Sequence, residues 1–123
     1  MVLMERKIGL TKTAGWQFGV RKTVNAPLEY IWNDMFSENG LAKWNEGVDT
    51  DFSTFKAYSH VRTKWKLNNW KNKATLQIRL VQGQAPGKTT IAVHIDQLLD
   101  ENQRREAQEY WSAIITHIAN DYH

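Results

Sequence analysis

The chain of 123 residues contains no cysteine and only two prolines. The absence of cysteine excludes disulfides, thiolate nucleophiles and cysteine-based zinc sites, and it suits a reducing, cytoplasmic location. No apolar run approaches the roughly 18 residues of a membrane-spanning helix, and the first residues lack the apolar segment of a secretory signal. We therefore expect one cytoplasmic domain without a membrane span.

Acidic residues are missing from the middle of the chain. Residues 52–95 carry eight Lys or Arg and no Asp or Glu, whereas residues 96–123 carry two bases and six acids. A basic run of this kind is either a footprint for phosphates or anionic lipid, or a solvated sheet face that attracts the acidic helix of the same molecule. We take the solvated face as the simpler interpretation.

Alternation of apolar and polar residues predicts the strands. Residues 16–24 form a half-buried strand, and three successive antiparallel strands follow near 58–66, 74–80 and 89–95. Residues 49–56 are a poorly patterned further strand. In the strand near 58–66, Val61 and Trp65 share the apolar face, whereas Arg62 and Lys64 share the basic face.

Apolar residues at helical spacing predict the helices. A helix of about 10 residues begins near residue 28, with Asn25 as its N-cap and a proline in its first turn. Residues 37–40 interrupt it, and Leu41 and Trp44 suggest a short helical turn. The terminal helix, about 20 residues long, starts with a capping box at Asp100 and Gln103. The fold class is therefore α+β, a short antiparallel sheet covered on one face by a long C-terminal helix.

Several short stretches in this order resemble one known family. They are Arg21-Lys-Thr-Val24, Ala26-Pro-Leu28, Ile31-Trp32, Val61-Arg62 with Trp65, Gly87-Lys-Thr-Thr90, Ile91-Ala-Val-His94, Gln97-Leu98 and Tyr110-Trp111. The chain resembles helix-grip domains of the START/Bet v 1-like (SRPBCC) superfamily, in particular the domain of Hsp90 ATPase activator homologues. The resemblance covers residues 5–121. Residues 1–14 are similar to the linker that precedes this domain in bacterial relatives, which leaves 15–123 as the single helix-grip domain.

The resemblance implies a curved sheet whose concave side and terminal helix enclose a hydrophobic cavity. Relatives usually have six or seven strands, whereas this chain has room for four or five. We therefore expect a small cavity, or one filled by aromatic residues or by a second subunit. The candidate cavity-lining residues are Phe36, Trp44, Trp65, Ile78, Val93, Tyr110, Trp111 and Ile114.

No catalytic constellation is visible in the sequence. The serines lie outside any nucleophile-elbow motif. His60 and His94 share the outer sheet face without an obvious third metal ligand, so we expect no metal site. Glu106 and Glu109 fall on the wet side of the terminal helix, where they are solubilising residues and not an acid–base pair. We expect no enzyme activity and no cofactor, although relatives include hydrolases and cyclases.

Basic and aromatic residues interleave between Tyr58 and Lys73, as they do in proteins that bind single-stranded nucleic acid. The candidate basic face consists of Arg62, Lys64, Lys66 and Arg79. Trp65, however, falls with Val61 on the apolar face, so we expect a core residue and not a stacking platform, which argues against nucleic acid as the partner.

Three functional hypotheses follow. The first is non-catalytic binding of a hydrophobic or amphipathic small molecule between the C-terminal helix and the sheet. The second, implied only by the resemblance, is a chaperone-associated module that binds a protein partner or forms a homodimer. The third is nucleic-acid binding through the basic face.

Overall fold

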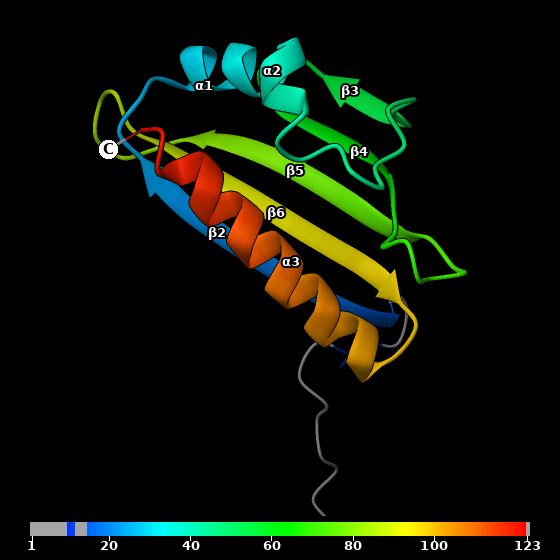
Figure 1. The fold of residues 1–123 in the computed structure, drawn as a ribbon. Coiled ribbons are helices and arrows are strands. Elements are labelled where there is room, and N and C mark those ends of the chain that lie inside the picture. Colours follow the sequence, from blue (N-terminus) through cyan, green and yellow to red (C-terminus); the bar gives the residue numbers. More distant parts are fainter. Residues whose placement is uncertain (1–9, 12–14, 123) are drawn as a thin grey trace, which may run out of the picture.

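Six antiparallel strands make one sheet in the order β1-β2-β6-β5-β4-β3 (Figure 1). The computed structural model describes residues 10–11 and 15–122. The elements are β1 (Leu10–Thr11), β2 (Gly15–Val24), α1 (Leu28–Met35), α2 (Glu38–Leu41), β3 (Thr54–Lys56), β4 (His60–Trp65), β5 (Ala74–Gln82), β6 (Thr89–Leu98) and α3 (Glu101–Ala119). Both short strands lie at the sheet edges. They bring the total to six, more than the four or five that the sequence predicts.

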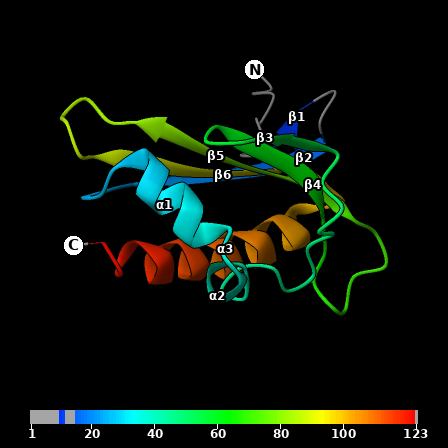
Figure 2. The same ribbon diagram turned by 90° about the horizontal axis from the view of Figure 1, so that it is seen from above.

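The three helices lie on one face of the sheet, and the opposite face is not covered by any described helix (Figure 2). Helix α3 packs against β2 and β6, whereas α1 packs against β5. This is the predicted α+β helix-grip arrangement, with α3 as the helix that covers the sheet. Among the described residues, no helix has both the length and the apolar character needed to cross a bilayer.

The start of α1 differs from the prediction. Asn25 is not the N-cap, because the helix begins at Leu28 with Pro27 as its N-cap at φ −64°. The extended conformation of Pro27 sets the entry to the helix. The backbone N–H of Asn25 instead donates to the Tyr122 carbonyl at 3.2 Å, which joins the end of β2 to the end of the chain.

Residues 37–40 do not simply interrupt the helical segment, as the sequence suggests, but begin α2. The Ser37 hydroxyl accepts a hydrogen bond from the Gly40 N–H at 3.0 Å, which satisfies a free donor at the helix start. The backbone N–H of Trp44 then donates to the Leu41 carbonyl at 3.0 Å, so the helical path continues as a turn. The predicted turn at Leu41 and Trp44 is therefore the end of a longer helical segment.

The start of α3 is capped as predicted. The Asp100 carboxylate accepts from the Gln103 N–H at 2.8 Å. The Gln103 side chain completes a variant of the capping box, because its oxygen accepts from the N–H of Leu99 and not from that of Asp100. Its amide nitrogen also donates to Asn72 at 2.7 Å. These bonds tie the first turn of α3 to the β4–β5 loop.

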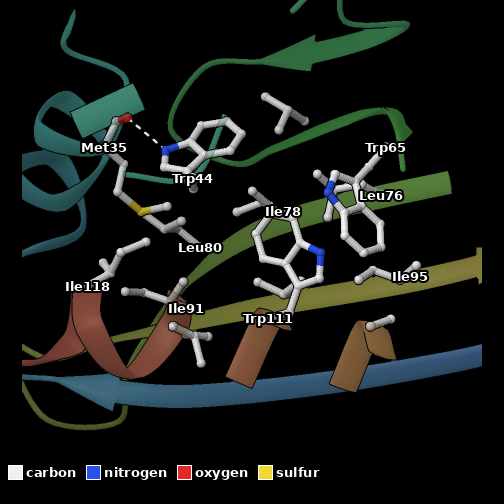
Figure 3. Packing of buried hydrophobic residues seen from close by; sticks show 14 of the residues in the cluster. Met35, Trp44, Trp65, Leu76, Ile78, Leu80, Ile91, Ile95, Trp111 and Ile118 are labelled. Atoms are coloured by element: carbon white, nitrogen blue, oxygen red, sulfur yellow. Dashed lines mark hydrogen bonds between the residues drawn. The ribbon is translucent and has the colours of Figure 1, made fainter. Parts of the chain in front are cut away.

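Three indole rings occupy the centre of the core. Trp44, Trp65 and Trp111 are each at most 1% exposed, and Figure 3 shows them between the helices and the sheet, among residues that include Ile78 and Ile95. Burying rings of this size supplies a large share of the hydrophobic stabilisation of a small domain.

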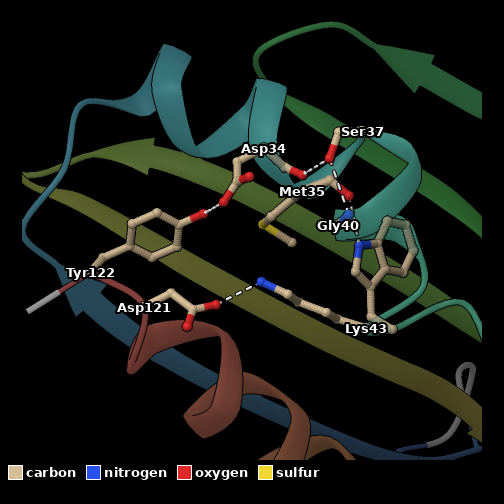
Figure 4. Close-up of polar contacts among 8 residues, drawn as sticks. Asp34, Met35, Ser37, Gly40, Lys43, Asp121 and Tyr122 are labelled. Carbon is tan, nitrogen blue, oxygen red and sulfur yellow. Dashed lines mark hydrogen bonds and ion pairs between the residues drawn. The ribbon is translucent and has the colours of Figure 1, made fainter.

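Polar contacts join the C-terminal end of α3 to α1 and α2 (Figure 4). The Tyr122 hydroxyl donates to the Asp34 carboxylate. Lys43 forms an ion pair with Asp121 at 2.6 Å. Burial of the phenol, and then its hydrogen bond to Asp34, raise the pKa of Tyr122 above its ordinary value of 10.0. Together these contacts close the helical layer over the end of the sheet.

The raised pKa of Tyr122 predicts a loss of stability in alkaline solution. The folded state holds the phenol proton more tightly than the unfolded chain does. This contribution is therefore complete below pH 10 and declines as the pH rises through the folded-state pKa. Tyr122→Phe should lower the free energy of unfolding at pH 8 by about 1.5–3 kcal/mol, the usual value for a hydrogen bond to a charged group.

Denaturant unfolding of both proteins between pH 8 and 11 measures this effect. The wild-type protein should lose more stability over that range than Tyr122→Phe. Parallel pH profiles would contradict the role given to the Tyr122–Asp34 hydrogen bond.

Candidate ligand-binding site

The predicted cavity-lining residues lie on the helix side of the sheet. Five of them are buried: Trp44, Trp65, Ile78, Val93 and Trp111. Phe36, Tyr110 and Ile114 are partly buried and pack against that core. The structure divides the aromatic members into two groups, one around Trp65 and one around Phe36.

The first group is an aromatic stack at the contact of α3 with β4. Tyr110 stacks on Trp65 with ring centroids 5.5 Å apart, and Trp111 meets Trp65 edge to face at 5.6 Å. Trp70 contacts the same ring at 5.0 Å. The sequence did not single out Trp70 as a lining residue, because it stands in a turn outside any periodic pattern.

The second group lies beside β3, the edge strand that pairs with β4. Phe36 contacts Trp44 at 5.4 Å and Phe55 at 5.6 Å, and it stacks on Trp32 at 4.3 Å. Phe52 joins these rings. Phe52 and Phe55 were also missed, because residues 49–56 show no clear alternation.

Side chains fill the interface between α3 and the sheet. Trp65 and Trp111 have no exposed surface, and Ile78 is 1% exposed. At these residues indole rings occupy the space where the resemblance implies a cavity. Any ligand in this interface has to displace a side chain.

Two of the buried indoles have an unpaired N–H. The Nε1 atoms of Trp65 and Trp111 find no hydrogen-bond acceptor among the described residues, whereas Trp44 Nε1 donates to the Met35 carbonyl at 3.0 Å. In Figure 3 the nitrogens of Trp65 and Trp111 lie on the ring edges that face each other. Leaving a buried donor unpaired costs about 1–3 kcal/mol. A hydrogen-bond acceptor placed beside either N–H would therefore stabilise this part of the core.

Two adjoining surface hollows reach the edge of this stack. One, of about 350 Å³, is lined by Gly47, Val48, Asp49, Lys64, Lys66, Asn68 and Lys73. The other, of about 240 Å³, is lined by Glu46, Lys66, Leu67, Asn68, Asn69 and Tyr110. We call the two together the mouth.

The mouth leads directly to Trp65. Tyr110 forms part of its wall and stacks on the Trp65 ring. On the other side, a Cβ atom added to Gly47 would lie 3.3 Å from Trp65 Nε1. The unpaired N–H therefore lies just beneath the Gly47 backbone, at the boundary between core and mouth.

The mouth carries more basic than acidic side chains. Lys66 lies just beyond β4 and donates to the Trp70 carbonyl at 2.7 Å, so its ammonium group is held in place. Lys64 donates to Thr75 at 3.1 Å, and Lys73 lines the same hollow. Burial, and to a smaller extent the nearby Glu46, raise the pKa of Tyr110, which keeps its phenol neutral. The mouth thus suits a ligand with an anionic or acceptor group.

The predicted basic face is split by the structure. Arg62, Lys64 and Arg79 are exposed on strands β4 and β5, on the side of the sheet opposite the buried Val61 and Ile78. Lys66 lies beyond the end of β4 and lines the mouth, which Lys64 also reaches from the edge of the sheet.

Catalytic groups do not assemble at the mouth or elsewhere in the part of the chain that the structure describes. Ser59 and His60 share a hydrogen bond of 2.9 Å, but no carboxylate among residues 15–122 bonds to His60, so an orienting third group is missing. Over the same residues, no three His, Asp or Glu side chains gather as metal ligands would.

The unpaired N–H of Trp65 predicts a difference between two Trp→Phe variants. Trp44→Phe removes a hydrogen bond and leaves the buried Met35 carbonyl without its donor. Trp65→Phe removes a donor that has no acceptor. Trp44→Phe should therefore destabilise the protein more, by about 1–3 kcal/mol. Denaturant unfolding of the two variants measures this difference, and equal destabilisation would show that Trp65 Nε1 does have an acceptor.

Comparison with known proteins supports the fold. No protein-family model matches the sequence, and no curated protein matches it. The structure is similar to CalU16 from Micromonospora echinospora, with a TM-score of 0.70 and 13% identity over 84% of this chain and 71% of that one. It is also similar to PFC0360w, an HSP90 activator from Plasmodium falciparum, with a TM-score of 0.66 and 12% identity over 82% of this chain and 91% of that one.

A third similar structure is the Aha1 dimer from Colwellia psychrerythraea, with a TM-score of 0.68 and 10% identity over 86% of this chain and 95% of that one. At these identities the likeness concerns the fold. The protein has the helix-grip fold that the resemblance of its sequence implies, and it shares this fold with CalU16, PFC0360w and the Aha1 dimer.

Proposed function

We propose that the protein binds, without catalysis, a small amphipathic molecule that enters through the mouth and reaches the aromatic stack of Trp65, Tyr110 and Trp111. The observation that carries this proposal is the pair of unpaired indole N–H groups in the core. Buried donors are almost always paired, and exceptions often mark a place where another molecule supplies the acceptor.

Tyr110 is the side chain that a ligand would displace. It is partly buried and lines the mouth, and its ring lies nearly parallel to that of Trp65, at 28°. A flat apolar group could take over this stacking position if the Tyr110 ring rotated toward solvent. The exchange replaces one aromatic contact by another, so the core stays filled while the ligand is bound.

The hydrogen-bond donors around the site indicate which polar group the ligand carries. The N–H of Trp65 and the lysines of the mouth all donate hydrogen bonds, so they favour a carbonyl, carboxylate or sulfonate oxygen. The mouth, at about 350 Å³ for its larger hollow, lies at the lower end of the usual range for ligand pockets, about 300–1,000 Å³. The expected ligand is therefore a small, flat molecule with one acceptor or anionic end.

The absence of catalysis is part of the proposal. The mouth is lined by lysines, asparagines, Tyr110 and the carboxylates of Glu46 and Asp49. It has no serine, threonine or histidine that would act as a nucleophile beside a base.

The indole N–H resonances in a ¹H–¹⁵N spectrum test this proposal. The probe is anilinonaphthalene sulfonate, a flat aromatic anion. Its addition should shift the resonances of Trp65 and Trp111, while Trp44, whose N–H is already bonded, serves as the internal control. Saturation at 100 times the dissociation constant should also stabilise the fold by about 2.7 kcal/mol. Equal shifts of all six indoles, or no shift of Trp65, would contradict the proposed site.

Two variants test the part played by Tyr110. Tyr110→Ala removes the ring that competes with the ligand, so the probe should bind several-fold more tightly even though the fold loses stability. Ile114→Ala is the matched control, one helical turn away and also partly buried. Weaker binding in Tyr110→Ala than in Ile114→Ala would show that Tyr110 does not occupy the ligand position.

A second candidate function is contact with a chaperone, favoured by an exposed aromatic edge. Phe55 of β3 is 53% exposed and Tyr58 is 46% exposed, and similar structures include an HSP90 activator. Exposed aromatic groups are common at protein interfaces. Stimulation of Hsp90 ATPase activity, lost in Phe55→Ser and kept in the control Leu99→Ser, would support this function. Lack of stimulation by the wild-type protein would exclude it.

A further inference from the structure

The sheet face opposite the helices, here called the outer face, presents a row of residues that includes three Lys or Arg side chains. Antiparallel pairing places Lys56, His60, Arg79, Ala92 and Arg21 directly opposite one another across β3, β4, β5, β6 and β2. Residues opposite one another share a face, and strands are about 4.8 Å apart, so the row extends over about 19 Å.

The Lys and Arg side chains of this row have no polar partner within the described structure. Lys56, Arg79 and Arg21 are exposed, and their side chains form no hydrogen bond or ion pair with residues 15–122. Arg62 lies in the adjacent row, opposite Gln77. The nearby acid on this face is Asp96 of β6, whose carboxylate lies 4.0 Å from the His94 ring.

A recess lies in the middle of the outer face. It has a volume of about 270 Å³ and is lined by Gly19, Val20, Arg21, Ala92, Val93 and His94. The recess exists because the register pairs Gly19 with His94 and Ala92 with Arg21, so two small residues stand beside two long ones. This volume lies below that of a usual ligand pocket and suits one inserted side chain.

We propose that the outer face docks an acidic segment of a partner protein. Carboxylates of the segment would pair with Arg79, Lys56 and Arg21, and one of its side chains would fill the recess. Arginine forks bind carboxylates in two parallel hydrogen bonds, which orients a peptide as well as attracting it. This interaction is separate from the ligand site, because Arg79, Lys56 and Arg21 do not line the mouth.

An acidic peptide fits this face better than nucleic acid does. Single-strand binding needs exposed aromatic platforms among the cations. Trp65 and Trp70 are buried, and the Tyr58 hydroxyl donates to Asn33 near the end of α1, on the helix side. The outer face therefore offers charge and a recess without stacking platforms.

Fluorescence anisotropy with a labelled peptide of alternating Glu and Ala residues tests the proposal. Arg79→Glu and Arg21→Glu should each weaken binding about tenfold or more, whereas Lys71→Glu, the same change of charge in the β4–β5 loop, should have little effect. Affinity should also fall as salt is raised from about 50 to 200 mM.

A second variant separates the recess from the charge. Ala92→Leu fills the recess and keeps every cation, so it should weaken binding while the fold and the response of the Trp65 indole to anilinonaphthalene sulfonate stay unchanged. The proposal is overturned if the peptide does not bind at low salt, or if Lys71→Glu weakens binding as much as Arg79→Glu. It is equally overturned if oligothymidylate or anionic vesicles bind more tightly than the peptide, or if a second copy of this chain occupies the face in sedimentation experiments.

Discussion

The contact between the indoles of Trp65 and Trp111 holds the helical layer against the sheet. Trp65 comes from β4 and Trp111 from α3, and their rings meet edge to face at 5.6 Å with no exposed surface. Helix α3 itself packs against β2 and β6. The Trp65–Trp111 contact therefore extends the core from these strands to β4. The same contact leaves both N–H groups without acceptors. The packing that stabilises the core is thus also the arrangement on which the proposed ligand site depends.

The rest of the helical layer depends on polar contacts at its ends. At the start of α3, Gln103 bonds both to Leu99 and to Asn72. Beyond its end, Tyr122 bonds to Asp34. Tyr110, which lies between these two ends, is partly buried and lines the mouth. On the outer face, Arg21, Lys56 and Arg79 are exposed and form no ion pair within residues 15–122.

Much of the fold could be predicted from the sequence because it follows from local periodicity. The alternation that places Trp65 with Val61, away from Arg62, is a property of one strand, and the Asp100 cap is a property of four consecutive residues. The acceptor of each indole could not be predicted. Trp44 bonds to the Met35 carbonyl because α1 ends at Met35 and α2 begins at Glu38, with Ser37 as its N-cap. The sequence instead predicts an interruption at residues 37–40. The recess likewise depends on the register between Gly19 and His94, which no single strand specifies.

The proposed ligand site requires the core to open at Tyr110 and expose the N–H of Trp65. Hydrogen exchange of the indole protons measures this opening directly, because a buried proton exchanges only when it is exposed. We expect Trp65 to exchange through a local opening with a free energy well below that of global unfolding, whereas Trp44 should exchange only on global unfolding. Exchange of both indoles with the global free energy would show that the core is closed to any ligand.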